Sequence, residues 1–88
     1  MERTYYPNGK IKTECFYDDE SEIEKFSEWS VTGQLLCRET FDSDGRPHGE
    51  LIHTDWDGNY DYTYYLYGEF VTKEEYRKHQ LIEQLAGI

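Results

Sequence analysis

Glycine recurs along this 88-residue chain at near-regular intervals, usually inside a short polar stretch between two runs of strand-forming residues. The series is Gly9, Gly33, Gly45, Gly58 and Gly68, with intervals of 24, 12, 13 and 10 residues. Halving the first interval predicts a further turn near residue 21, inside the polar segment DDESE. Glycine adopts positive φ without steric cost and is therefore common in tight turns. The spacing predicts antiparallel hairpins with strands of about five to eight residues.

The segments between these turns are rich in Tyr, Phe, Ile, Val, Thr and Trp, which strands favour. We expect strands at about 2–6, 10–17, 23–31, 34–42, 48–56 and 60–67, and a short one at 69–71. Asn8-Gly9, Asp44-Gly45 and Asp57-Gly58 predict two-residue turns. The pattern indicates a mainly β protein, an antiparallel meander of about six strands built from repeat-like hairpins.

The C-terminal segment has a different pattern. Thr72 and Glu75 have the spacing of a helix capping box, and Glu74 adds a second acid to the first turn, where the helix dipole favours negative charge. An apolar stripe is formed by Tyr76, Leu81, Ile82 and Leu85. Gly87 lies where a C-cap is expected. These signals predict an α-helix over about 73–86 that closes one end or one face of the sheet.

Length and composition favour a single domain, 1–88, with hairpins over 1–71 and a capping helix within 72–88. Aromatic residues make up 17% of the chain, so large rings must supply much of the buried area. No apolar run approaches the roughly 20 residues of a membrane span, and MERTYYPNG lacks the apolar region of a signal peptide. We expect a cytoplasmic protein without membrane contact.

The register of the sheet is left open by the sequence. In the segment NYDYTYYLY, alternation places Tyr60, Tyr62, Tyr64 and Leu66 on one face. Two-residue turns would extend that face through Leu51 and His53 to Leu36 and Arg38. A change of one residue in either turn would place Ile52 and Trp56 there instead.

The charge is strongly negative and uneven. The net charge is −10, and residues 14–69 carry 15 acids against three bases, whereas the two ends carry four acids and six bases. Such a field repels nucleic-acid phosphates and attracts basic protein surfaces. We therefore expect no direct binding of nucleic acid. The charge also has a simpler interpretation, which is solubility in a chain rich in aromatic residues.

Two groups of residues are candidates for binding a partner. The first is the acidic run of Asp18, Asp19, Glu20, Glu22, Glu24 and Glu28. If residues 22–28 alternate as a strand, three of these carboxylates project from one face with Phe26 among them. Such a stripe could stand in for phosphates in the basic groove of a nuclease or other nucleic-acid-binding protein. The alternative is a solvated hairpin tip.

The second candidate group is the tyrosines, especially Tyr60, Tyr62 and Tyr64. Nine tyrosines in this chain exceed what a one-layer sheet can bury, and tyrosine is common at interface hot spots. Packing of a thin sheet is the alternative explanation for part of this excess.

No pattern of catalytic, metal-binding or cofactor-binding residues is recognised. His48, His53 and His79 share no short ligand spacing, and no serine lies in a nucleophile elbow. Cys15 and Cys37 are expected to be reduced thiols, with a disulfide between neighbouring strands as the alternative. We therefore expect no enzyme activity, metal or cofactor.

Several phrases resemble a known family, the MORN-type β-hairpin repeats, particularly small phage and bacterial versions. The matching residues are Tyr6, Asn8, Gly9 and Lys10, then Asp44, Gly45, His48 and Gly49, then Asp57 and Gly58, and finally 68–72 with Glu75 and Tyr76. The resemblance implies a non-enzymatic interaction module, such as an antitoxin-like protein or a phage-encoded counter-defence protein. Our hypothesis is a stoichiometric inhibitor that binds a basic partner surface as a monomer or small homo-oligomer. The alternative is an assembly protein that oligomerises through a sheet edge or aromatic face.

Overall fold

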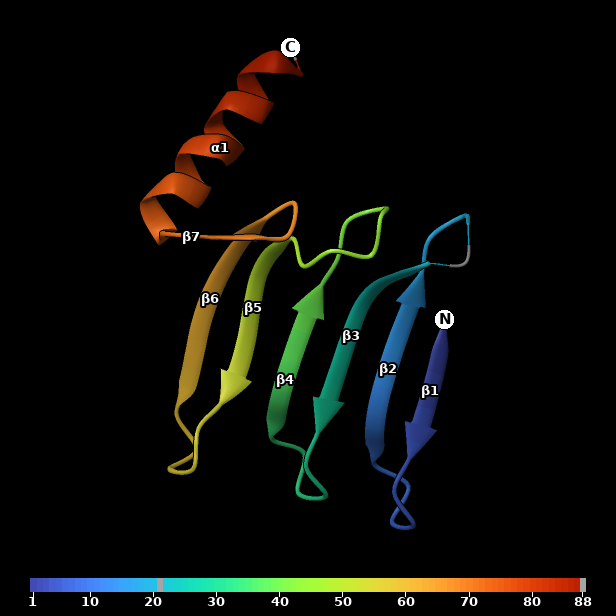
Figure 1. Cartoon of the computed structure of the whole chain (residues 1–88). Coiled ribbons are helices and arrows are strands. Elements are labelled where there is room, and N and C mark those ends of the chain that lie inside the picture. The colour runs from blue at the N-terminus through green and yellow to red at the C-terminus, as the bar shows by residue number, and fades with distance from the viewer. Residues whose placement is uncertain (21, 88) are drawn as a thin grey trace.

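Seven antiparallel strands form one sheet in chain order, with a single helix at its end (Figure 1). The computed structural model describes residues 1–20 and 22–87. The elements are β1 (Glu2–Tyr5), β2 (Ile11–Tyr17), β3 (Ile23–Trp29), β4 (Leu35–Thr40), β5 (Gly49–Thr54), β6 (Tyr60–Leu66), β7 (Glu69–Val71) and α1 (Lys73–Ala86). The predicted meander and C-terminal helix are confirmed, and the seventh strand is the short segment expected at 69–71.

The hairpin loops repeat one hydrogen-bond pattern. The backbone N–H of each first loop residue donates to the carbonyl four positions on; the five first residues are Tyr6, Asp18, Ser30, Asp42 and Asp55. In four of the loops a glycine N–H donates back to the first residue, and these glycines have φ between +79° and +96°. This is the pattern of a three-residue hairpin loop with glycine in the left-handed region. The expected two-residue turns are therefore wrong by one residue, although the predicted positive φ values are confirmed, including that of Gly68.

In three of the five loops an aspartate side chain stabilises the turn. The Asp42 carboxylate oxygen Oδ1 accepts hydrogen bonds from the backbone N–H groups of Asp44 and Arg46. The side chains of Asp18 and Asp55 accept the equivalent pairs in their own loops. The turn predicted near residue 21 is present between Asp18 and Glu22, although Ser21 itself lies outside the described residues.

The longer loops shift the register of the sheet. Tyr62 pairs with Ile52, and Ile52 pairs with Arg38. The expectation that the Tyr60 face continues through Leu51 and His53 is therefore wrong; Ile52 from the alternative lies there, next to the expected Arg38. The cause is the single extra loop residue, because a shift by one position moves every side chain to the other face. Trp56 lies in the loop between β5 and β6 rather than on a strand face.

The sheet is a single layer with a small core. Among the described hydrophobic residues only Leu51 and Tyr64 are buried, and Ser27 is the buried polar residue. The exposed surface is 6440 Å², compared with about 5,500 Å² expected for a compact monomer of this mass. The radius of gyration is 14.9 Å, compared with about 12 Å expected for this length. Both measures reflect sheet faces that no second layer covers.

Helix α1 covers one corner of the sheet rather than an end or a face. It begins with the predicted capping box between Thr72 and Glu75, and none of its described residues is buried. Tyr76 packs against Tyr64 with ring centroids 5.2 Å apart. The other residues of the predicted stripe are Leu81, Ile82 and Leu85, which are 56%, 56% and 64% exposed. At 3.6 residues per turn they point away from the Tyr76 side, so the predicted apolar stripe is divided between two sides of the helix.

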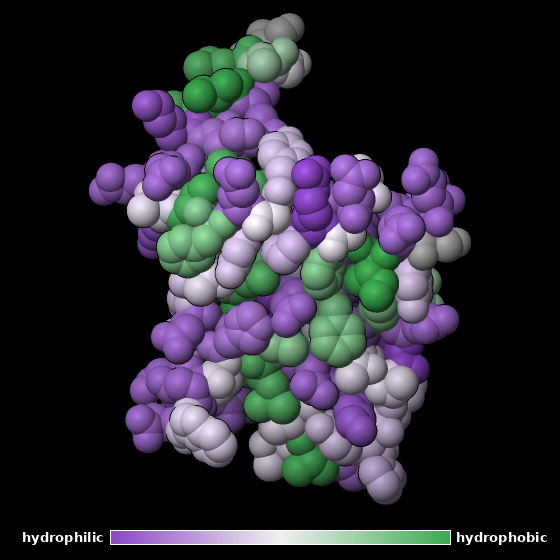
Figure 2. Space-filling view, viewed as in Figure 1, coloured by the Kyte–Doolittle hydropathy of each residue, from purple (hydrophilic) through white to green (hydrophobic). Residues whose placement is uncertain are grey.

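The hydrophobic end of α1 is visible as a group of apolar side chains far from the sheet (Figure 2). In the described part of the chain, no helix is long and apolar enough to cross a membrane.

The two cysteines are free, with Cys15 on β2 and Cys37 on β4. Strand β3 lies between them, which places their Cα atoms at least about 9–10 Å apart, beyond the reach of a disulfide. The alternative of a disulfide between neighbouring strands is therefore excluded by the strand order.

Candidate functional site

One face of the sheet carries carboxylates without compensating lysine or arginine. A row of directly paired residues crosses six strands: Thr4, Thr13, Glu28, Cys37, His53 and Asp61. The neighbouring row on the same face contains Glu2, Cys15, Phe26 and Glu39. These rows contain four acids, no lysine and no arginine. We call this surface the acidic face.

The other face, which we call the opposite face, holds the strand cations. Its central row consists of Arg3, Glu14, Ser27, Arg38, Ile52 and Tyr62. Lys25 pairs with Phe16 and Thr40 two positions further along the same face. The cations have local partners, because Arg3 forms an ion pair with Glu14 at 2.8 Å and Arg38 donates to Ser27 at 3.2 Å. Strand alternation thus separates the charges between the two faces.

The charges of the acidic face affect the groups between them. Burial raises the pKa of the Cys37 thiol, and the negative charges of Glu39 and Glu28 raise it further. Tyr17, on the same face, has its pKa raised to about 12 by hydrogen bonding with Cys15 and then with Glu2. In both cases a nearby carboxylate adds to the rise in pKa, because a negative charge disfavours further negative charge beside it.

Cys37, His53 and Glu39 form a group that resembles a nucleophilic site in composition. Cys37 pairs directly with His53, and the His53 Nε2 lies 3.1 Å from Glu39 Oε1. A nucleophilic cysteine needs its thiolate form, which a cationic neighbour or helix N-terminus favours. Burial and the carboxylates of Glu39 and Glu28 favour the neutral thiol of Cys37 instead. The surroundings of Cys37 therefore do not activate it as a nucleophile.

The predicted acidic run is only partly on the acidic face. Asp18, Asp19 and Glu20 lie in the β2–β3 loop, and Glu22 precedes β3. The register shifts where Phe16 pairs with Lys25 but Tyr17 pairs with Ile23, which makes Glu24 an extra residue in a β-bulge. The expected alternation of Glu22, Glu24 and Glu28 is therefore wrong, because a bulge interrupts the two-residue period. Glu28 lies on the acidic face.

The predicted tyrosines lie on the opposite face. Tyr62 pairs with Ile52 there and is 52% exposed. Tyr60 is 42% exposed, whereas Tyr64 is 9% exposed and donates a hydrogen bond to Glu50. The acidic face and the tyrosines therefore belong to different surfaces, and the sheet does not bring them into one site.

Sequence reasoning missed Glu2, Glu39 and Asp61 as members of one surface. The signal that could have found them is the length of the loops. An Asp or Ser lies three positions before Gly33, Gly45 and Gly58 and marks a three-residue loop, and that loop length sets the pairing of the strand residues next to each loop.

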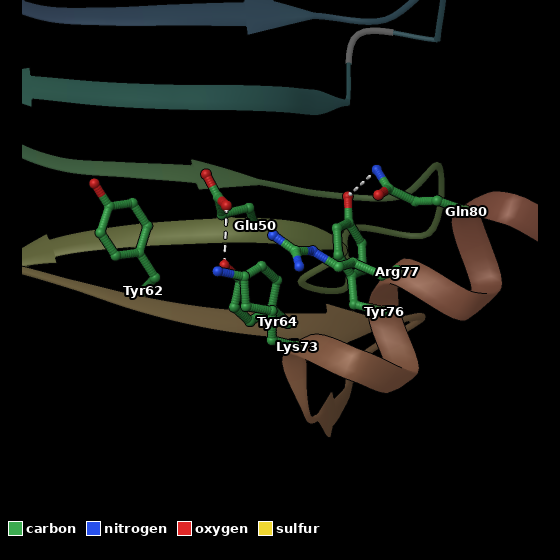
Figure 3. A pocket seen from close by; sticks show the side chains of 7 residues that line it. All are labelled: Glu50, Tyr62, Tyr64, Lys73, Tyr76, Arg77 and Gln80. Atoms are coloured by element: carbon green, nitrogen blue, oxygen red, sulfur yellow. Dashed lines mark hydrogen bonds between the residues drawn. The ribbon is translucent and has the colours of Figure 1, made fainter.

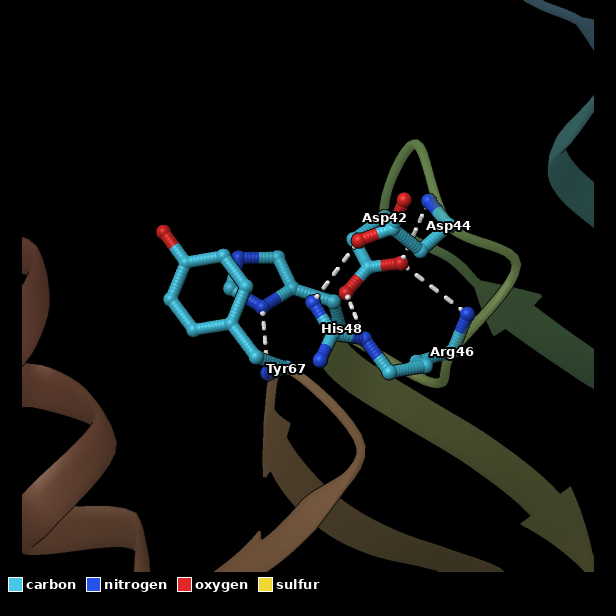
Figure 4. Close-up of polar contacts among 5 residues, drawn as sticks. All are labelled: Asp42, Asp44, Arg46, His48 and Tyr67. Carbon is cyan, nitrogen blue, oxygen red and sulfur yellow. Dashed lines mark hydrogen bonds and ion pairs between the residues drawn. The ribbon is translucent and has the colours of Figure 1, made fainter.

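A third group of residues joins the β4–β5 loop to the β6–β7 turn (Figure 4). Arg46 forms ion pairs with Asp42 at 2.9 Å and Asp44 at 3.1 Å, and its guanidinium lies 5.9 Å from the Tyr67 ring centroid. Burial works to raise the pKa of Asp42, but hydrogen bonds from the backbone N–H groups of Arg46 and Asp44 and from the Arg46 side chain outweigh it and lower that pKa. The loop between β4 and β5 is thereby held beside the β6–β7 turn.

His48 and His79, which are distant in sequence, meet at this corner. Their ring centroids are 6.5 Å apart, and Glu83 lies 3.6 Å from His79 Nδ1. The Nδ1 of His48 accepts a hydrogen bond from the Tyr67 backbone. Within residues 1–20 and 22–87, no cluster of three or more His, Cys, Asp or Glu side chains is arranged to hold a metal ion.

Comparison of the chain with models of protein families, with curated proteins and with solved structures gave no match. The fold defines the chain as a single-layer antiparallel meander with a C-terminal helix. Its function is therefore argued from its own surfaces.

Proposed function

We propose that this chain is a non-catalytic protein-binding module whose acidic face docks on a basic surface of a partner protein. The observation that carries the proposal is the separation of charge across the sheet. Glu28 and Asp61 lie in one row, with Glu2 and Glu39 in the next, and neither row contains lysine or arginine. A fixed surface of one sign attracts a partner of the other sign and orients it during encounter.

The mode of action that fits this surface best is stoichiometric inhibition. Proteins that bind nucleic acid present clustered lysine and arginine to the phosphates. The carboxylates on β1, β3, β4 and β6, strands that are spaced about 4.8 Å from one to the next, offer such a cluster a rigid negative surface. The resemblance to MORN-type repeats also supports an interaction module, including an antitoxin-type or phage-encoded protein. We therefore propose that the chain competes with nucleic acid for a basic groove.

A second candidate function is assembly through self-association. It is favoured by the exposed surface of 6440 Å² and by the exposed side chains of Leu81, Ile82 and Leu85 on α1. Strand β1 also leaves one edge of the sheet open, and an open edge can pair with another copy. The mass of the protein in solution distinguishes the two candidates. A monomer supports the inhibitor, and a closed oligomer supports assembly.

The experiment that tests the inhibitor compares two double charge reversals with the same change in net charge. Glu28→Lys with Asp61→Lys alters the acidic face, and leaves the contact between Glu39 and His53 intact. Asp57→Lys with Glu69→Lys is the matched control, because these exposed acids lie in a loop and on β7.

Partners are captured on the wild-type protein from lysate of the source cell at low salt, and are then purified for kinetic measurement. We expect the acidic-face variant to slow association about tenfold at low salt and the control to change it less than about threefold. The purified partner should bind one copy of the chain and release its nucleic acid in doing so. Equal effects of the two double variants, or binding without displacement of nucleic acid, would contradict the proposal.

A further inference from the structure

A hollow of about 410 Å³ lies between the first half of α1 and the opposite face of the sheet (Figure 3). Its main lining residues are Glu50, Tyr62, Tyr64, Lys73, Tyr76 and Arg77. The volume is within the range of about 300–1,000 Å³ that is usual for small-molecule sites. The lining comes from β5, β6 and α1, so the hollow exists only because the helix packs on this corner.

The rings in the hollow differ in how firmly they are held. Tyr64 and Tyr76 pack against each other, with 36° between their planes. Their hydroxyl groups are also engaged, since Tyr64 donates to Glu50 and Tyr76 accepts from Gln80, each at 3.1 Å. Tyr62 has no ring partner among the described aromatic pairs and is 52% exposed. Its ring is therefore available to stack on another planar group.

The charges in the hollow are opposite in sign to those of the chain. Lys73 and Arg77 lie one helical turn apart, and their side chains extend toward the space between helix and sheet in Figure 3. Neither forms an ion pair in the described part of the chain. Glu50 is the one acid that lines the hollow, and it accepts the Tyr64 hydroxyl hydrogen bond. The lining thus has two cations and one acid, in a chain of net charge −10.

We propose that this hollow binds a small molecule with a planar ring and one anionic group, either a phosphate or a carboxylate. The ring stacks on Tyr62, and the anionic group lies between the Lys73 ammonium and the Arg77 guanidinium. Guanidinium and ammonium groups form strong, charge-assisted hydrogen bonds with phosphate and carboxylate oxygens. The site is separate from the acidic face, and it stands or falls independently of the proposed inhibitor function.

The two positive charges that line the hollow disfavour a cationic ligand. Three tyrosines and a carboxylate could also surround an ammonium group through cation–π contacts. Lys73 and Arg77 would repel such a ligand from the same hollow. Replacement of Glu50 therefore separates the two cases, because it removes a repulsion for an anion and an attraction for a cation.

The test uses two probes with the shared chemistry, AMP and 4-hydroxyphenylacetate, added to the full chain at up to about 5 mM and followed by NMR chemical shifts. The two probes distinguish a nucleotide phosphate from an aromatic carboxylate as the source of the anion. Phenol and inorganic phosphate serve as controls that have the ring alone and the anion alone.

The variants are Arg77→Ala, Lys73→Ala, Tyr62→Ala and Glu50→Gln, with Lys78→Ala as the matched control on the outer side of the helix. Circular dichroism shows whether each variant retains the helix. We expect at least one probe to bind, Arg77→Ala to weaken binding about tenfold, and Lys78→Ala to leave it within about twofold. Glu50→Gln should tighten binding about two- to threefold.

Several results would overturn this inference. One is the absence of shifts around Tyr62 and Arg77 with both probes. Others are equal binding of phenol or inorganic phosphate, equal effects of Arg77→Ala and Lys78→Ala, retention of full affinity in Tyr62→Ala, or weaker binding to Glu50→Gln. If Arg77→Ala disturbs the helix, Glu50→Gln still tests the inference, because Glu50 lies on β5 and not on α1.

Discussion

The backbone N–H of Tyr67 donates a hydrogen bond to Nδ1 of His48 at 3.0 Å, and the two rings lie 4.4 Å apart between centroids. Tyr67 has φ of +51°, the one positive φ outside glycine in the described residues. A residue other than glycine in this region is strained by about 1 kcal/mol or more. His48 therefore helps to hold the β6–β7 turn in a conformation that it would not adopt alone.

The first prediction tests this relationship. His48→Ala removes the acceptor and the stacked ring, and we expect the free energy of unfolding to fall by about 1–2 kcal/mol. The amide of Tyr67 should exchange with solvent at least tenfold faster. His53→Ala is the control, since this exposed histidine lies on the acidic face and its substitution should leave the Tyr67 amide unchanged. If the Tyr67 amide keeps its protection in His48→Ala, the histidine does not hold the turn.

A second prediction concerns Gly49, which has φ of +104° inside β5. A Cβ atom there would lie 2.8 Å from the Thr40 hydroxyl oxygen, whereas a Cβ on Gly9, with φ of +85°, would have nothing within 4 Å. Both alanine variants carry the cost of a positive φ, about 1 kcal/mol. Gly49→Ala adds a steric clash, so denaturant unfolding should show it to be less stable than Gly9→Ala by a further 1 kcal/mol or so. Equal losses would indicate that β4 and β5 move apart freely at this point.

The third prediction concerns the pH dependence of stability. The folded pKa of Asp42 is lower than its unfolded value, because backbone N–H groups and Arg46 favour the carboxylate. Its contribution is therefore present above the unfolded pKa of about 3.9 and is lost as the pH falls toward the folded pKa. Denaturant midpoints of wild type and Asp42→Asn should differ at pH 7 and converge in acid. A constant difference for Asp42→Asn would show that the charge is not what stabilises the loop.

The fourth prediction concerns nucleic acid. On the opposite face Arg3 is ion-paired, Arg38 is hydrogen-bonded and the Lys25 ammonium lies 5.2 Å from the Phe16 ring centroid, and the acidic face repels phosphate. Fluorescence anisotropy with duplex and single-stranded DNA and RNA should detect no complex at ~150 mM salt, because phosphate binding needs free lysine and arginine. A low-micromolar complex under these conditions would exclude the acidic-face inhibitor.

The local elements of the fold could be predicted because their signals are local. The glycine spacing located the turns, and Thr72 with Glu75 located the start of α1. The register could not be read from the dipeptides at the turns, because Asp57-Gly58 fits either a two-residue or a three-residue loop. That single residue decides whether Tyr62 lies opposite Ile52 or His53.

Prediction of the candidate surfaces would also have required the register of the sheet. The acidic face joins residues from six strands, from Glu2 on β1 to Asp61 on β6, so it follows only when every register between them is known. The charge pattern of the sequence also contains no feature that indicates the β-bulge at Glu24. The hollow under α1 required the placement of the helix, which depends on Tyr76 meeting Tyr64 and not on the sequence of either element alone.

The meander also determines how the chain can change its length. Each strand packs mainly against the strands next to it in sequence, and loop starts recur every 12 or 13 residues. No central core fixes the number of strands, so each hairpin behaves as a removable unit whose stability depends on its two neighbours, as in other linear repeat arrays. Excision of residues 18–41, which spans one two-strand period, would join equivalent loop positions and keep β5, β6, β7 and α1 in the chain. We expect the sheet to keep its architecture after the loss of two strands. Its width across a partner would then decrease by about 10 Å.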